Sequence, residues 1–116
     1  MLLSERVRKF RIEKITKTNN RYRKILYTTK QMQLIVQKLN FHQKVDKEKH
    51  PLSTQFIRIE SGKLKVTIFN KSGMKKFRTF YLNDGDSVVI PANTFHELES
   101  IDTRTTLYTL YAKPVH

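Results

Sequence analysis

Four side chains that could ligate a metal lie in two separate stretches of this 116-residue chain. Glu48 and His50 stand two residues apart ahead of Gln55, and His96 follows much later in the sequence. Side chains alternate between the two faces of a β-strand, so residues i and i+2 share a face. An extended segment at 48–50 would therefore point a carboxylate and an imidazole the same way. These groups suit iron, manganese, zinc, nickel or copper, and the amide of Gln55 offers a carbonyl oxygen.

The same alternation aims Gln55 and His96 toward apolar neighbours. Gln55 shares its parity with Ile57, and His96 shares its parity with Leu98. Each segment can therefore direct a polar group into the interior of a β-structure, while Glu97 takes the opposite face from His96. We expect either a divalent metal site at this point or a polar pocket that holds water or a small anion.

Short runs of alternating polarity, separated by Gly, Asn and Pro turns, cover most of the chain. No long amphipathic helical pattern is present, which predicts an all-β sandwich or barrel. We expect strands over 21–29, 31–40, 54–60, 63–69, 75–82, 87–90, 95–100 and 104–111, with 41–47 as a loop or short strand.

Two local predictions follow from this pattern. The dipeptide Ser61-Gly62 separates two strands and predicts a hairpin between residues 54–60 and 63–69. The strand aromatic residues, Phe77 and Tyr81 among them, are expected mostly in the core by alternation.

The stretches KEKHPLSTQFIRIESG (47–62) and NDGDSVVIPANTFH (83–96) resemble the paired motifs of the cupin superfamily. The resemblance implies a jelly-roll β-barrel or sandwich (a double-stranded β-helix) and a single cupin domain over residues 21–116. It places metal ligands at Glu48, His50, Gln55 and His96. The family pattern usually has histidine where Glu48 stands and glutamate where Gln55 stands, so one carboxylate is kept and one imidazole is lost.

The cupin superfamily includes dioxygenases, isomerases, epimerases and ligand-binding modules, and a fold does not choose among them. The resemblance therefore implies a small-molecule ligand and, for an enzyme, a metal-dependent oxygenase or isomerase. It identifies neither the substrate nor a catalytic residue.

Basic residues dominate the first part of the chain. The net charge is +13, and residues 1–30 carry ten Lys or Arg against only Glu5 and Glu13. Residues 1–20 are expected to form a basic arm or edge strand. The simplest interpretation of its charge is a solvated, lysine-rich surface without a binding role. The alternative function is a non-enzymatic dimeric scaffold whose basic segment binds nucleic acid or an acidic partner. Its candidate contacts are Arg6, Arg8, Lys9, Arg11, Arg21, Arg23 and Lys24.

Several classes of function are excluded by composition. The chain has no cysteine, so it has neither disulfides nor thiolate chemistry. Its three glycines belong to turns rather than to a phosphate loop, and no serine nucleophile pattern is present. His42 and His116 lie outside the motifs. Without an apolar window of membrane-spanning length or a signal peptide, we expect a cytoplasmic protein, with nucleus or virion interior still open. Exposed sheet edges favour a homodimer.

Overall fold

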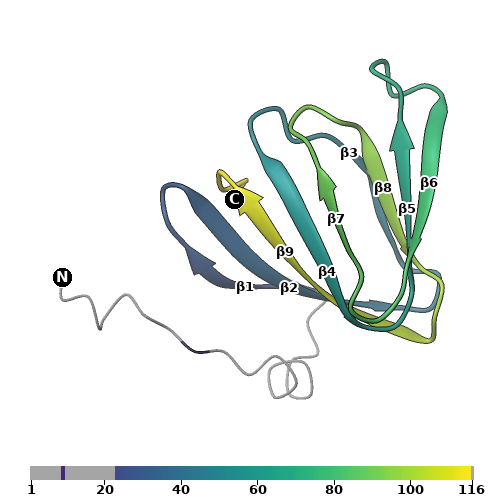
Figure 1. Ribbon diagram of the computed structural model, residues 1–116, viewed down its shortest axis with the longest axis horizontal. Helices are drawn as coiled ribbons and strands as arrows, with labels where there is room; N and C mark the ends of the chain where they lie inside the picture. Colours follow the sequence, from purple (N-terminus) through teal and green to yellow (C-terminus); the bar gives the residue numbers. More distant parts are fainter. Residues whose placement is uncertain (1–8, 10–22, 116) are drawn as a thin grey trace.

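Nine antiparallel strands form the part of the chain that the computed structural model describes, which is Lys9 and residues 23–115 (Figure 1). Within these residues there is no helix, and therefore none that could span a membrane. The strands are β1 (Arg23–Thr28), β2 (Met32–Asn40), β3 (Lys44–Glu48), β4 (Thr54–Ser61), β5 (Leu64–Phe69), β6 (Lys76–Leu82), β7 (Ser87–Ile90), β8 (His96–Ser100) and β9 (Arg104–Ala112).

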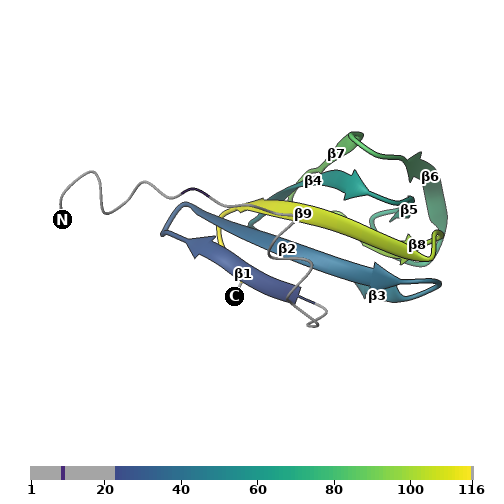
Figure 2. The ribbon, with the colours of Figure 1, turned by 90° about the horizontal axis from the view of Figure 1, so that it is seen from below.

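The strands form two sheets that face each other as a jelly roll (Figures 1 and 2). One sheet has the order β1-β2-β9-β4-β7, and the other has the order β3-β8-β5-β6. Strands distant in the sequence are neighbours, as where β9 lies between β2 and β4. The predicted all-β fold class is confirmed.

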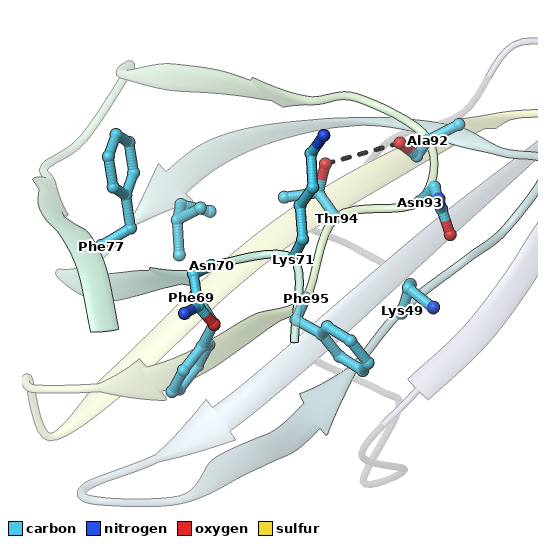
Figure 3. Close-up of a pocket in the computed structure, with 10 residues that line it drawn as sticks. Lys49, Phe69, Asn70, Lys71, Phe77, Ala92, Asn93, Thr94 and Phe95 are labelled. Carbon is cyan, nitrogen blue, oxygen red and sulfur yellow. Dashed lines mark hydrogen bonds between the residues drawn. The ribbon is translucent and has the colours of Figure 1, made fainter. Parts of the chain in front are cut away.

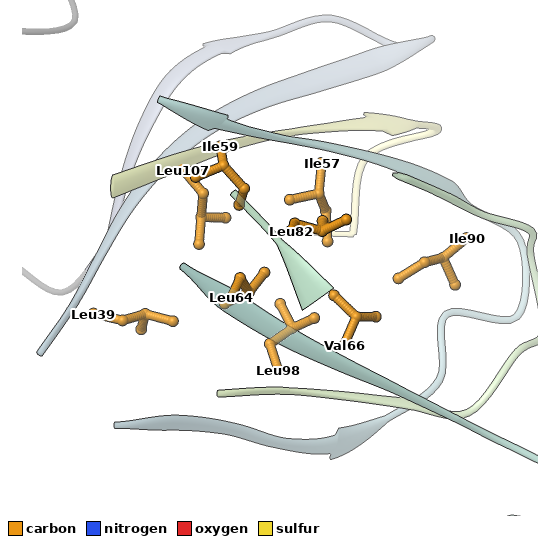
Figure 4. Close-up of a cluster of buried hydrophobic side chains, with 9 residues drawn as sticks. All are labelled: Leu39, Ile57, Ile59, Leu64, Val66, Leu82, Ile90, Leu98 and Leu107. Carbon is orange, nitrogen blue, oxygen red and sulfur yellow. The ribbon is translucent and has the colours of Figure 1, made fainter. Parts of the chain in front are cut away.

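An apolar core fills the space between the two sheets (Figure 4). Burial of one such aliphatic side chain stabilises the fold by about 1.5–3 kcal/mol. The same inner faces also carry buried polar residues, among them Gln55 and His96. The core residues are Leu39, Ile57, Ile59, Leu64, Val66, Leu82, Ile90, Leu98 and Leu107.

The predicted hairpin at Ser61-Gly62 is wrong. β4 pairs with β7 and β9, whereas β5 pairs with β6 and β8, so the chain crosses from one sheet to the other at this point. Gly62 has a φ of 105°, and a Cβ there would lie 2.6 Å from the carbonyl oxygen of Arg104. The glycine is needed for a tight corner against the start of β9 rather than for a two-strand turn.

The prediction that the aromatic side chains of β6 lie in the core is also wrong for two of them. Phe77 is 75% exposed and Tyr81 is 56% exposed. β6 is the last strand of its sheet, and its core face instead carries Phe80 and the buried Leu82. Alternation of residue types did not show which face of this edge strand is covered, because both faces contain aromatic residues.

Most of the basic arm predicted at residues 1–20 lies outside the described residues, and so do Arg6, Arg8, Arg11 and Arg21. Of the remaining candidate contacts for nucleic acid, Lys9 and Lys24 are exposed and Arg23 is half-buried at the start of β1. The homodimer stays a prediction.

Candidate metal centre

Glu48 ends β3 and faces the interior because of a β-bulge. Val45 pairs with Leu98, and Glu48 pairs with His96, so two residues of β3 stand opposite the single residue Glu97 of β8. A bulge of this kind re-aims the side chain that follows it. Without the extra residue, position 47 rather than the carboxylate of Glu48 would lie opposite His96.

His96 begins β8 and is almost completely buried, with 1% of its surface exposed. Its Nδ1 lies 2.9 Å from the carbonyl oxygen of Thr94. A carbonyl oxygen only accepts hydrogen bonds, so Nδ1 carries the proton and donates it. In the neutral ring, Nε2 therefore bears the lone pair, and this buried atom has no hydrogen-bond partner. It lies 3.6 Å from Oε1 of Glu48.

His50 follows β3 and is fixed by its neighbours on two sides. Its backbone carbonyl oxygen accepts a hydrogen bond of 2.8 Å from the backbone N–H of Asn93. Its ring contacts Tyr111 edge-on, with ring centroids 5.0 Å apart. Its Nε2 lies 3.2 Å from Oε1 of Glu48, the same oxygen that faces His96.

The three side chains thus converge on one point. One ligand atom from each of Glu48, His50 and His96 lies within 4.8 Å of the other two. Two ligands at about 2.1 Å from one metal ion are about 3.0 Å apart in octahedral geometry and about 3.4 Å apart in tetrahedral geometry. The separations of 3.2 Å and 3.6 Å between oxygen and nitrogen are close to those values.

The carboxylate of Glu48 is held in its ionised form. The hydrogen bond with His50 is the main cause, and a hydrogen bond from a protonated His96 ring adds to it, so that the pKa of Glu48 falls from 4.5 to about 2. Partial burial opposes this shift, but it is the smaller effect. At neutral pH the site therefore contains a full negative charge beside two imidazoles.

Comparison with known protein sequences finds relatives but no assigned activity. The chain is 35% identical over 107 residues to the uncharacterised protein YrkC of Bacillus subtilis, a match that covers 90% of this chain and 56% of YrkC. It is 33% identical over 105 residues to the uncharacterised protein L612 of Acanthamoeba polyphaga mimivirus, covering 87% of this chain and 62% of L612. The chain therefore spans little more than half the length of these curated relatives. No family model matches the sequence.

Solved structures with the same architecture are numerous. BH2720 of Bacillus halodurans has a TM-score of 0.85 at 28% identity and covers 93% of this chain and 82% of that one. A Klebsiella pneumoniae protein with a double-stranded β-helix domain has a TM-score of 0.78 at 15% identity, covering 97% and 90%. The cupin domain of Cnp3 from Schizosaccharomyces pombe has a TM-score of 0.72 at 14% identity, covering 86% and 67%. The chain has the cupin fold, a double-stranded β-helix.

Gln55 is connected to the three converging residues through Tyr111. It is 1% exposed on the inner face of β4, directly across from Tyr111 on β9. Its Nε2 donates a hydrogen bond of 3.3 Å to the hydroxyl oxygen of Tyr111, the residue whose ring touches His50. Its buried Oε1 has no hydrogen-bond partner. The role of Gln55 as a metal ligand therefore stays a prediction.

Three residues that contribute to this site were not predicted. Tyr111 has the parity of the core residue Leu107, so the alternation that placed Gln55 inward could have found it. Thr94 and Asn93 act through their backbone groups, and a backbone contact has no signature in the residue type. The loop that contains them orients both histidines.

Of the two histidines outside the predicted motifs, only His42 lies within the described residues, and it is a surface residue. His42 is exposed, and its Nδ1 lies 3.2 Å from Oε2 of Glu99. Glu99 lies on the same outward side of β8 as Glu97. His116 lies outside the described residues.

Proposed function

We propose that this cupin binds one divalent transition metal through Oε1 of Glu48 and the Nε2 atoms of His50 and His96. The metal would in turn hold a small oxygen-containing ligand inside the jelly roll. Both curated relatives named above are uncharacterised proteins, so the proposal is based on the chemistry of these residues.

One observation carries the proposal, namely the buried Nε2 of His96. Its lone pair has no donor and faces a carboxylate oxygen 3.6 Å away. A buried acceptor without a donor costs free energy, and two electron-rich atoms that face each other repel. A cation between the two atoms removes both costs. The hydrogen bond from Nδ1–H to Thr94 gives the ring the orientation that is typical of metal-binding histidines.

Two imidazoles and one carboxylate leave open coordination positions, a donor set that is typical of iron(II) and manganese and is also used by zinc, nickel or copper. A metal with open positions acts as a Lewis acid that polarises an oxygen of its ligand. Gln55 would orient that ligand or add its amide oxygen as a weak fourth donor. An oxygenase or isomerase activity is compatible with this arrangement.

A proton is the competing cation. If His50 is protonated, it can donate to Glu48 across their 3.2 Å contact, and the site is then an ion pair without metal. Metal content separates the two states. We expect near-stoichiometric metal in protein purified without an affinity tag or chelator, and its loss in the double variant His50→Ala/His96→Ala.

His42→Ala is the matched control, because His42 also pairs with a glutamate but lies on the surface. It should keep the metal content of the parent protein. The proposal fails if the parent remains metal-free after incubation with iron, manganese, nickel, copper and zinc. It also fails if the double variant retains the parent's metal content.

A further inference from the structure

The seam between β6 and β7 forms an apolar groove. These strands are the last members of their two sheets. A cleft of about 190 Å³ lies along them and is bordered by Phe77, Phe80, Val88, Val89 and Pro91. It continues into an open cleft of about 740 Å³ beside the loop at residues 92–95, and the two share Ile68, Phe77 and Thr94 (Figure 3).

Two features leave apolar surface uncovered along this groove. Ile68 pairs with Arg78 and Phe69 pairs with Lys76, so Phe77 is the extra residue of a bulge in β6. The bulge turns Phe77 into the lining of both clefts, where it is 75% exposed. Val89 on β7 is 58% exposed on the other side. Adjoining exposed apolar side chains of this kind are typical of a binding surface.

All charged groups that line the groove are positive. They are Arg78 in the smaller cleft and Lys49 and Lys71 in the larger one, and neither lining contains an acidic residue. The guanidinium of Arg78 lies 4.4 Å from the centre of the Phe80 ring, which fixes it against the apolar wall. An apolar ligand alone would not need these charges, whereas an anion complements them.

Arg78 also lies in the same cross-strand row as two of the candidate metal ligands. The pairs Glu48–His96, His96–Ile68 and Ile68–Arg78 follow one another across β3, β8, β5 and β6. Neighbouring strands are about 4.8 Å apart, so Arg78 stands about 10 Å from His96 on the same inner face, with the apolar Ile68 between them.

We propose that this groove binds a small organic anion, with its carboxylate at Arg78 and a short apolar chain against Phe77, Val88 and Val89. The site does not depend on a metal at Glu48, and it is assigned by its own lining residues. A peptide strand that pairs with the open edge of β6 would use backbone hydrogen bonds instead of Arg78, and its binding would not follow the charge of the ligand.

The test is a titration of metal-free, 15N-labelled protein with hexanoate in the presence of EDTA, followed by amide chemical shifts. Hexanoate should give saturable shifts at Phe77, Arg78 and Val89. Hexylamine has the same chain with the opposite charge, and acetate has the same charge without the chain. Both should bind at least fivefold more weakly. EDTA removes any metal, so failure here is distinct from failure of the metal proposal.

Two matched pairs of variants on β6 locate the site. Arg78→Gln should raise the Kd for hexanoate roughly fivefold to tenfold, since it removes a charge-assisted hydrogen bond. Lys76→Gln removes an exposed charge outside the lining and should leave the Kd unchanged. Phe77→Ser should weaken binding, whereas Tyr81→Ser should not, because Tyr81 is exposed but does not line either cleft.

Three results would overturn the proposal. The first is the absence of saturable shifts with hexanoate. The second is equal binding of hexanoate and hexylamine, which would make the groove an apolar surface without selectivity for anions. The third is an equal increase in the Kd for hexanoate in Arg78→Gln and Lys76→Gln, which would mean that binding depends only on the overall charge of the chain.

Discussion

A single oxygen of Glu48 serves both histidines of the site. At separations of 3.2 Å and 3.6 Å, protonated rings of His50 and His96 would each donate from Nε2 to this oxygen, which is why the pKa of the carboxyl lies far below its ordinary value. The same carboxylate is the only anionic group among the three converging residues. Its replacement should therefore affect both the stability of the metal-free fold and metal affinity.

The pKa of Glu48 predicts a defined dependence of stability on pH. The carboxyl has a pKa of 4.5 when unfolded and about 2 when folded, so its contribution is fully present above pH 4.5 and is lost as the pH falls toward 2. The side chain is 36% exposed, so solvent screening limits that contribution to about 1 kcal/mol or less. Urea denaturation in EDTA should show wild type more stable than Glu48→Gln near pH 6, with a difference that disappears toward pH 2. A difference that does not change with pH would contradict the assignment.

Gln55→Glu tests whether position 55 belongs to the ligand set. A buried carboxylate without a partner should destabilise the metal-free protein by about 1–3 kcal/mol. Metal should then offset this cost and give a larger rise in Tm than in wild type.

Gln37→Glu provides the control for Gln55→Glu, because Gln37 is also buried on the inner face of the same sheet, in the row of Leu107. This variant should be destabilised without a metal-dependent recovery. Equal metal responses of Gln55→Glu and wild type, measured by thermal unfolding, would place residue 55 outside the coordination sphere.

At the scale of elements, the β5–β6 turn packs against the loop that leads into His96. Gly73 in the turn has a φ of 73°, and a Cβ there would lie 2.9 Å from the ring of Phe95. Lys47 on β3 also contacts this turn, because its Nζ donates a hydrogen bond of 2.6 Å to the carbonyl oxygen of Gly73. The turn therefore supports the residue immediately before His96.

The pair Gly73→Ala and Gly85→Ala separates backbone strain from this contact. Gly85 has a φ of 81°, but a Cβ there would have no atom within 4 Å. Gly85→Ala should cost about 1 kcal/mol from strain alone, and Gly73→Ala roughly 2–3 kcal/mol because Phe95 must also move. Chemical denaturation measures both values. Equal losses would show that the turn and the loop are not coupled.

The elements also show how far the sequence could lead. β5 was predictable because its polar and apolar residues alternate, and β7 because its short apolar run lies between Gly85 and Pro91. The pairing of β4 with β9 was not predictable, because it joins residues that are distant in the chain. Without this pairing, β4 was expected to pair with the next strand in the sequence, which produced the wrong hairpin at Ser61-Gly62. The site residues Glu48, His50 and His96 were predicted together from parity and motif. The bulge in β3 that makes the geometry possible has no signal in the residue types.

At the scale of the whole molecule, a bound metal should stabilise the fold against unfolding. Its three candidate ligands come from β3, the segment after it and β8, so a metal would stabilise the folded state and not the unfolded chain. At a metal concentration of 100 times Kd, binding should raise the free energy of unfolding by about 2.7 kcal/mol, which corresponds to a rise in Tm of roughly 10 °C for a domain of this size. Scanning calorimetry with and without EDTA should show this shift in wild type and none in His50→Ala/His96→Ala. An equal shift in both would mean that metal binds elsewhere.

The most direct test of the central claim is anomalous scattering from crystals grown with zinc, with data collected on both sides of the zinc absorption edge. We predict one strong anomalous peak about 2.0–2.2 Å from Oε1 of Glu48 and from the Nε2 atoms of His50 and His96. The peak should be absent from crystals of the His50→Ala/His96→Ala variant. A zinc-grown crystal with no peak at these three atoms, or with peaks only at surface residues such as His42 and Glu99, would contradict the assignment of the metal centre.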